Sequence, residues 1–372
     1  MDEDWAVLLS FLPAGWEQLA VSTGALKGLR KDKPAEGYLR TLLLHLAGGH
    51  SLRETAARAK LAGLADVSDV ALLGRLIKAK EWLRQLCVAL GEQQGLAADA
   101  AAPFQFRLFD ATTVKEPGAT GSLWRIHYSL RLPSLTCDYF RITAAKGAGN
   151  GESFFQFANN KDDYLIADRG YCTGPGINHV AAKQAFVLVR VNSSSLTPLT
   201  PNHIPFPLLE KVQALKRAGT IGSWPALIPN RGGATVAGRM CAVRKTAAAI
   251  RLAHEKLELD ARRKGQTLKP TTYEFAKYVI VFTNYPAEQF DDAAVLEWYR
   301  RRWQIELLFK RFKSLAQLGH LPKQNDDSAL AWLYGKLFAA LLTEKLLTAA
   351  VSISPWGYDL GGTATTQRLA RI

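Results

Sequence analysis

The sequence predicts an α/β protein in which a helical N-terminal domain precedes a mixed β-sheet covered by helices. Two observations carry this prediction. Residues 1 to about 100 have apolar side chains at helical spacing, and from residue 104 onward apolar segments of strand length alternate with helical ones. With 372 residues, 48% hydrophobic and 22% charged, the chain has the composition of a folded protein with two or three domains.

The N-terminal hundred residues predict at least three helices. Tyr38 to Ala47 is apolar at helical spacing and ends at two glycines. Ser51, followed three residues later by Glu54, predicts a capping box at the start of the next helix. A third helix is expected from Ser68 to about Leu90. Two short helices around a glycine-containing turn fit a helix-turn-helix, and a small helical bundle fits equally well.

The middle of the chain predicts a mixed sheet. The alanine-rich stretch Ala97 to Ala102 is expected to be a linker, and a helix is expected from Ile177 to Gln184. The strand candidates are Phe104 to Phe109, Trp124 to Leu132, Cys137 to Thr143, Tyr164 to Ala167, Ala185 to Val191 and Tyr278 to Thr283. Strands that first come one after another and then alternate with helices favour a mixed sheet with helices packed against it.

Residues 192–277 have a different composition, rich in proline, glycine and arginine. We expect this segment to be a β-rich insertion that forms no part of the first sheet, with a strand at Ala234 to Val243. The expected domains are therefore a helical domain at 1–100, a catalytic core at 101–191 and 278–320, the insertion at 192–277, and a helical C-terminal segment at 321–372.

The charge of the chain indicates a polyanionic partner. Its net charge is +14 and its pI about 9.6, which favours DNA or RNA, although a merely basic protein fits the same numbers. Four isolated cysteines form no CxxC pair and predict neither a zinc site nor disulfides. An acidic N-terminus and the charge-interrupted apolar stretch Leu337 to Ile353 predict a cytoplasmic protein without a membrane span.

Two aspartates follow apolar strands and are candidates for chemistry. Asp110 comes after Phe104 to Phe109, and Asp168 comes after Tyr164 to Ala167. Carboxylates at strand ends can coordinate a hard cation such as Mg²⁺. Each aspartate taken alone is better explained as an ordinary turn residue.

A long helix predicted from Asp291 to about Leu318 carries a third carboxylate. Tyr299, Arg302, Glu306 and Lys313 lie at offsets of 0, 3, 7 and 14 residues. At about 100° per residue, these offsets place all four on one narrow stripe of a continuous helix. An i,i+4 salt bridge explains Arg302 and Glu306 but not the other two residues.

The stripe has the spacing of the YREK signature of IS4-type transposases, and the chain resembles that family over about residues 20 to 345. Asp110-Ala111-Thr112-Thr113 resembles the first aspartate motif, and Gly121 to Tyr128 resembles the segment that comes after that motif in the family. Asp168-Arg169-Gly170-Tyr171 resembles the second aspartate motif, and Trp303 to Lys313 resembles the helix of the third.

The resemblance implies a ribonuclease H-like (integrase-like) fold with Asp110, Asp168 and Glu306 as a DDE triad that holds two Mg²⁺ or Mn²⁺ ions. Two ions about 4 Å apart can activate an attacking oxygen and stabilise a leaving one. The implied reactions are nicking at the transposon end and strand transfer into target DNA, with a hairpin intermediate in some families of this kind.

The other implied roles concern DNA. Tyr299, Arg302 and Lys313 would hold DNA phosphates, and Arg169 beside the site could do the same. Trp224 would stack on a flipped base, although a core or turn tryptophan is the more common role. His127 has no evident catalytic partner and is interpreted as structural. A homodimer in a synaptic complex is also implied.

Two further functions fit the same residues. The tail from Tyr358 to Ile372 does not continue the helical pattern, and members of the family usually carry a longer helical C-terminus. A truncated, non-transposing DNA-binding protein that acts as an inhibitor or is a relic is therefore one alternative. A nuclease on the same fold is another.

Overall fold

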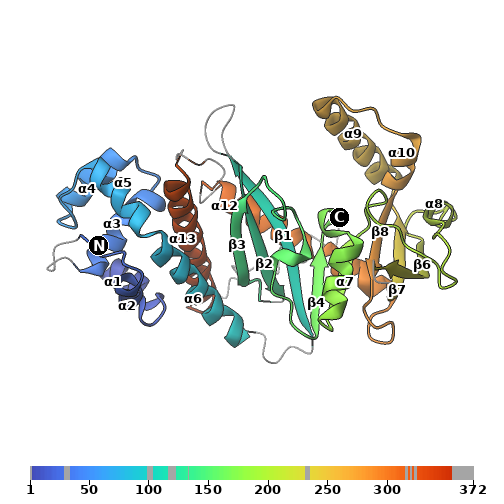
Figure 1. The fold of residues 1–372 in the computed structure, drawn as a ribbon, viewed down its shortest axis with the longest axis horizontal. Helices are drawn as coiled ribbons and strands as arrows, with labels where there is room; N and C mark the ends of the chain where they lie inside the picture. Colours follow the sequence, from blue (N-terminus) through green and yellow to red (C-terminus); the bar gives the residue numbers. More distant parts are fainter. Residues whose placement is uncertain are drawn as a thin grey trace.

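A computed structural model describes residues 2–28, 34–98, 104–115, 123–132, 134–230, 235–314, 317–318, 321 and 325–353. The predicted tail after Tyr358, the end of the predicted linker and Gly121 lie outside these residues. Figure 1 shows a group of helices beside a twisted sheet, with a helical hairpin standing away from the far end of that sheet.

The N-terminal part is helical, as predicted. Ser51 accepts a hydrogen bond from the backbone N–H of Glu54, and Ser68 caps the next helix in the same way through Ala71. The third predicted helix is two helices, with the break at Ala79. The helices are α1 (Asp2–Ser10), α2 (Trp16–Ser22), α3 (Ala35–Leu46), α4 (Leu52–Leu61), α5 (Asp69–Lys78) and α6 (Lys80–Ala98).

The strands among the described residues form one mixed sheet in the order β3-β2-β1-β4-β5-β8-β7-β6. β3, β2 and β1 are antiparallel neighbours, and β1, β4 and β5 run parallel. Each later neighbouring pair, β5 with β8, β8 with β7 and β7 with β6, is antiparallel. Their bounds are β1 (Gln105–Lys115), β2 (Leu123–Leu132), β3 (Cys137–Ala144), β4 (Asp163–Ala167), β5 (Phe186–Arg190), β6 (Ile221–Pro229), β7 (Thr235–Arg244) and β8 (Tyr278–Thr283).

The remaining helices cover the sheet or extend from it. In Figure 1, α7 lies in front of the sheet, α12 behind it, and α13 lies alongside α6. Thr173 caps α7, Asp291 caps α11 and Thr246 caps α9, each through a side-chain oxygen. Their bounds are α7 (Gly174–Ala182), α8 (Leu208–Gln213), α9 (Ala247–Lys264), α10 (Pro270–Ala276), α11 (Asp292–Arg300), α12 (Trp303–Ser314) and α13 (Asp326–Ile353), with short 3₁₀ helices η1 (Phe154–Gln156) and η2 (Arg169–Tyr171).

The expectation that residues 192–277 stay outside the first sheet is wrong. Strands β6 and β7 from this segment continue the sheet, because β8 pairs with β5 on one side and with β7 on the other. The sequence of β6 contains a glycine and two prolines and has no clear alternation, so it does not resemble a strand of the core. β6 belongs to the sheet because it pairs with β7, and its own sequence does not indicate that pairing.

Two cores lie on opposite faces of the sheet. Along β1, Phe106 and Leu108 pack in a core that also contains the N-terminal helices, α12 and α13, whereas Phe109 packs in the core on the α7 side. Along β4, Tyr164 and Ile166 share the first core. Because successive strand side chains point to opposite faces, even-numbered positions on both strands face α11 and α12.

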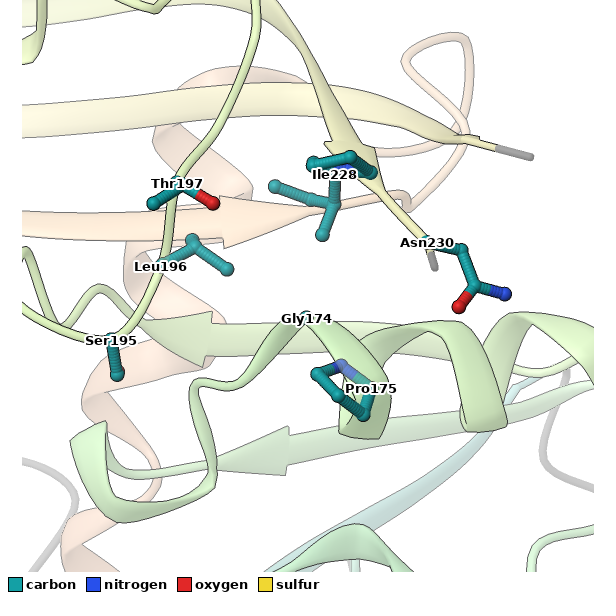
Figure 2. Close-up of a pocket in the computed structure, with 8 residues that line it drawn as sticks. Gly174, Pro175, Ser195, Leu196, Thr197, Ile228 and Asn230 are labelled. Atoms are coloured by element: carbon teal, nitrogen blue, oxygen red, sulfur yellow. The ribbon is translucent and has the colours of Figure 1, made fainter. Parts of the chain in front are cut away.

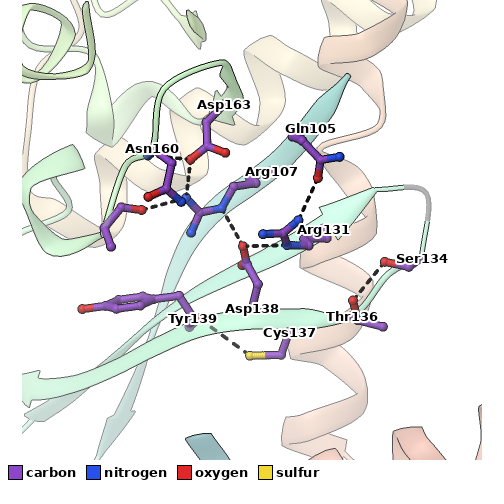
Figure 3. Close-up of polar contacts among 11 residues, drawn as sticks. Gln105, Arg107, Arg131, Ser134, Thr136, Cys137, Asp138, Tyr139, Asn160 and Asp163 are labelled. Atoms are coloured by element: carbon purple, nitrogen blue, oxygen red, sulfur yellow. Dashed lines mark hydrogen bonds and ion pairs between the residues drawn. The ribbon is translucent and has the colours of Figure 1, made fainter. Parts of the chain in front are cut away.

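An ion cluster is enclosed on the second face, at the start of β1 (Figure 3). Arg107 contacts Asp163 at 2.8 Å and Asp138 at 2.6 Å, and it also donates to the carbonyl of Ala158 at 2.7 Å. Arg131 adds a second cation to Asp138 at 3.2 Å. We call Arg107, Asp138 and Asp163 the closed ion cluster, because their side chains are 3%, 7% and 5% exposed.

Candidate active site

Asp110 and Asp168 become neighbours where two parallel strands part. The pairing of β1 with β4 ends at Phe109 and Ala167, so each aspartate is the residue that directly follows the last paired residue of its segment. Asp168 follows its strand, as predicted. Asp110 does not end a strand, because β1 continues to Lys115 by pairing with β2 alone. The apolar run that predicts the strand stops at Phe109, but backbone pairing does not require apolar side chains.

The helix predicted from Asp291 to Leu318 is not continuous. It is divided into α11 and α12, with Arg301 and Arg302 between them. At this break the backbone N–H groups of Arg302 and Ile305 bond to carbonyls three residues earlier, at 3.1 and 3.2 Å, in place of the four-residue α-helical pattern. The single stripe expected at about 100° per residue is therefore not the geometry that brings Tyr299, Arg302 and Glu306 together.

Two residues of the predicted signature, Tyr299 and Arg302, nevertheless contact the aspartates. The Tyr299 hydroxyl lies 3.1 Å from Asp168 Oδ1 and donates to it. Arg302 Nη1 lies 3.8 Å from Asp110 Oδ2, and Arg302 Nη2 donates to Glu306 Oε1 at 2.5 Å. The turn between the helices thus places one arginine between a strand carboxylate and a helix carboxylate.

The two aspartates have opposite electrostatic surroundings. Burial raises the pKa of Asp110 to about 7, although the backbone N–H of Ala111 and the charge of Arg302 act against that rise. Burial also raises the pKa of Asp168, but Arg302, the backbone N–H of Arg169 and other donors outweigh it, so the net pKa is lowered. Asp168 is therefore a stable carboxylate, whereas the charge of Asp110 is costly even with Arg302 nearby.

Glu152 is a nearby acidic residue that the sequence did not indicate. Its Oε2 lies against the backbone of Gly170, in the space that a Cβ at that position would occupy. Burial raises the pKa of Glu152, Arg125 lowers it, and the charge of Asp168 raises it further. No spacing rule links Glu152 to Asp168. Only the fold of the 3₁₀ turn after β4 brings the two together.

The other predicted residues lie farther out. Lys313 is exposed near the end of α12, and within the described part of the chain it forms no ion pair. Arg169 is an exposed residue of η2, and partial desolvation of its guanidinium together with the charge of Arg190 lowers its pKa. Trp224 lies on β6, partly buried, with its ring over Gly222 and against the second core. That packing favours the structural role considered for Trp224.

His127 is structural, in agreement with the prediction. It is fully buried on β2, and its Nε2 lies 3.2 Å from Thr143 Oγ1. Burial, together with Arg125 and Arg141, lowers the pKa of His127 to about 4, so the ring stays neutral. The ring is therefore a core residue rather than part of the carboxylate site.

A pocket of about 180 Å³ lies elsewhere, between the start of α7 and the end of β6 (Figure 2). It is lined by Gly174, Pro175, Ser195, Leu196, Thr197, Ile228, Pro229 and Asn230. None of these residues is charged, and the Ser195 hydroxyl donates to the carbonyl of Cys172. The pocket has no donor set for a cation, so the carboxylates are the better candidate for the chemistry.

The carboxylates suit a divalent cation in their donor chemistry, because hard cations prefer oxygen ligands. Their placement is less suitable. Within the described ranges, no three side chains of the ligand type lie close enough to share one ion. Of the three carboxylates, Glu306 is hydrogen-bonded to Arg302, which also contacts Asp110, and Asp168 is hydrogen-bonded to Tyr299.

Among the helices that the structure describes, none is long and apolar enough to cross a membrane.

Comparison with known proteins agrees with the geometry. Residues 152–342 match the transposase DDE domain, a range that contains Asp168 and Glu306. The chain is 32% identical over 362 residues to the putative transposase InsL for insertion sequence element IS186A of Escherichia coli (strain K12), covering 95% of this chain and 96% of that protein. It is 31% identical over 363 residues to the transposase for insertion sequence element IS421 of Escherichia coli, with the same coverage of both chains.

A shorter match is to a transposase of another bacterium. Over 92 residues, 25% of this chain and 20% of the other, the protein is 30% identical to the transposase for insertion sequence element IS1151 of Clostridium perfringens. The two long matches cover both aspartates and the turn between α11 and α12. The chain belongs to the DDE transposases of insertion sequences, of the IS4 type.

Proposed function

We propose that this protein transposes an insertion sequence by cutting DNA at the ends of its element and joining the freed 3′-hydroxyl to target DNA. One observation carries the proposal. Tyr299 contacts Asp168, and Arg302 contacts both Asp110 and Glu306. These contacts link three carboxylates that are 58 and 138 positions apart in the chain (168 − 110 and 306 − 168). A structural salt bridge alone would not need Tyr299 on Asp168.

The proposed cofactor is Mg²⁺ or Mn²⁺, most simply two ions held by Asp110, Asp168 and Glu306. When bound, such ions supply charge stabilisation for the attacking and leaving oxygens of a phosphodiester. The raised pKa of Asp110 supports this assignment, because a buried carboxylate without sufficient compensation favours a cation beside it.

The residues of the chain would do the rest. Tyr299 orients the Asp168 carboxylate through its hydroxyl, and Arg302 can present a planar pair of donors to a phosphate. Lys313 and Arg169 are exposed cations and would position the DNA backbone. The net charge of +14 would attract DNA to the protein from a distance. Trp224 would have to leave its packing against Gly222 to stack on a base.

The strand order supports the proposed ribonuclease H-like core. Three antiparallel strands, β3, β2 and β1, are followed in the sheet by the parallel strands β4 and β5, and the aspartates lie on β1 and after β4. In this proposal β6, β7 and the hairpin of α9 and α10 are the inserted part, joined to the core through β8. Pairing of two subunits on the two transposon ends completes the proposal.

The test uses the full-length protein with DNA carrying the ends of its own element and Mg²⁺. We expect nicked ends and strand-transfer products from the native protein, and none from Glu306→Gln, which should still shift the DNA in a gel. Glu297→Gln is the matched control, because Glu297 is an exposed residue of α11 whose ion pair is with Arg300 on the same helix. That variant should cleave normally.

Each other outcome has a definite meaning. Cleavage by Glu306→Gln would contradict the assigned triad. Nicks without strand transfer would favour a nuclease. Retained gel shift with no product from the native protein would favour a non-transposing DNA-binding protein. A hairpin band on a denaturing gel would establish the hairpin route.

A further inference from the structure

Arg302 occupies the position between two of the three site carboxylates. Its guanidinium reaches Glu306 at 2.5 Å and Asp110 at 3.8 Å, and its side chain is 11% exposed. A planar cation with several donors can neutralise two carboxylates at once. In this structure Asp110 and Glu306 therefore share the positive charge of the Arg302 guanidinium.

Arg302 is held less tightly than the arginine of the closed ion cluster. Its contact with Glu306 is short, but Asp110 lies 3.8 Å away and the Tyr299 ring, 5.8 Å away, provides only a weak cation–π contact. Arg107, by contrast, lies 2.6–2.8 Å from two carboxylates and a carbonyl. The Nε atoms of both arginines lack a well-aligned acceptor in the described structure, so the difference lies in the distances to their carboxylates.

Arg302 and a divalent cation would compete for the same oxygens. Two positive charges about 4 Å apart repel each other strongly inside a protein, and a divalent ion doubles that repulsion. A metal ion that uses Glu306 Oε1 must also break the shortest contact of Arg302. The turn between α11 and α12 bears the arginine, so the side chain can rotate without unwinding either helix.

We propose that Arg302 is a built-in competitor of the metal: it bridges Asp110 and Glu306 when no ion is bound, and metal binding displaces it toward DNA phosphate. This inference rests on the proposed function, because it takes the carboxylates to be the metal site. Arg302 is in this sense a positioning residue that sets metal affinity. DNA and metal then favour the same state, since phosphate offers the displaced guanidinium a new partner.

Mn²⁺ binding to the DNA-free, full-length protein tests the inference, with free Mn²⁺ followed by electron paramagnetic resonance. Arg302→Gln should bind Mn²⁺ about tenfold or more tightly, because a hydrogen bond to a charged group contributes about 1.5–3 kcal/mol. A purely structural role would predict weaker binding. Arg302→Lys keeps the charge but lacks the planar pair of donors, so its Mn²⁺ affinity should lie between those of the native protein and Arg302→Gln.

Arg301→Gln is the matched control, since it removes the exposed cation next to Arg302 in the same turn, whose guanidinium lies over the Trp298 ring and forms no ion pair in the described part of the chain. Its Mn²⁺ affinity should change less than about threefold. Equal gains in Arg301→Gln and Arg302→Gln, or no gain in Arg302→Gln, would overturn the inference. If Arg302→Gln does not fold, the affinity of Arg302→Lys decides, and a value at or below that of the native protein overturns it.

The outcomes separate this inference from the proposed function. Uptake of Mn²⁺ by the native protein that is lost in Glu306→Gln supports the metal site whatever Arg302 does. Mn²⁺ uptake that is the same in the native protein and in Arg302→Gln contradicts only the proposed competition between Arg302 and the metal. Absence of uptake by native protein and Arg302→Gln alike contradicts both.

Discussion

The first half of β1 carries two charged clusters only three residues apart, and they differ in how completely each charge is enclosed. The closed ion cluster around Arg107 has side chains 3–7% exposed. The site around Asp110 has side chains 11%, 16% and 31% exposed for Arg302, Asp110 and Glu306, and Arg302 lies 3.8 Å from Asp110.

The difference teaches which charges stabilise the fold and which are available for a ligand. Alternation along β1 sends Arg107 to one face of the sheet, under loops that surround it, and Asp110 to the face of α11 and α12. Enclosed charges with several partners have nothing further to bind. Half-open charges with incomplete partners can exchange a protein contact for an ion or a phosphate.

The largest effect should come from opening the closed ion cluster. Arg107→Met leaves the buried carboxylates of Asp163 and Asp138 short of a cation, and we expect a loss of about 3–5 kcal/mol in the free energy of unfolding, measured by urea denaturation. Arg302→Gln, in the open site, should lose far less. A loss below about 1 kcal/mol for Arg107→Met would place both clusters in one class.

Asp110→Asn should stabilise the protein at alkaline pH. The folded-state pKa of Asp110, about 7, lies above its ordinary value of 3.8, so the folded protein binds more protons between these values and loses stability as pH rises through them. Asparagine cannot ionise, and we expect a gain of about 1–2 kcal/mol at pH 8 that shrinks toward pH 5.

Melting temperatures at the two pH values measure that gain. Asp163→Asn in the closed ion cluster is the control and should destabilise the protein at both, because it removes an ion pair with Arg107. A lower melting temperature for Asp110→Asn at pH 8 than for the native protein would show that the open site contributes to stability after all.

Tyr299→Phe should cost about 1 kcal/mol at neutral pH, since it removes one hydrogen bond to the Asp168 carboxylate. The folded-state pKa of Asp168 is lowered, so the stability linked to it is present above its ordinary pKa of 3.8 and is lost as pH falls. The deficit of Tyr299→Phe should therefore diminish in acid when urea denaturation is compared across pH. A deficit that stays constant with pH would mean that the hydroxyl acts on packing alone.

The smallest effect on stability should come from Lys313→Ala, within about 0.5 kcal/mol of the native protein. DNA binding should weaken, and the slope of log affinity against log salt should decrease by about 0.9 if one phosphate contact is lost. Arg251→Ala, an exposed cation on α9, serves as the control with an unchanged slope. Equal slopes for both variants would remove Lys313 from the DNA interface.

Local chemistry was sufficient for much of the prediction. The apolar runs predicted β2, β4 and β8 to within a residue, and the caps at Ser51 and Ser68 were visible as hydroxyls ahead of helical patterns. The motifs around Asp110, Asp168 and Glu306 identified the family that the comparisons confirm. These features depend on residues close in the chain, and for that reason they can be read without the fold.

Contacts between distant segments could not be predicted from the sequence. The sequence by itself determined the helical and mixed-sheet composition of the chain, the three candidate carboxylates and the family. The tertiary structure decided that β6 and β7 extend the sheet, that Glu152 lies beside Gly170, and that a break at Arg302 replaces a straight helix. The physical reason is that periodicity describes one element at a time, whereas strand neighbours and the direction of a side chain at a turn are set by what packs on the other side.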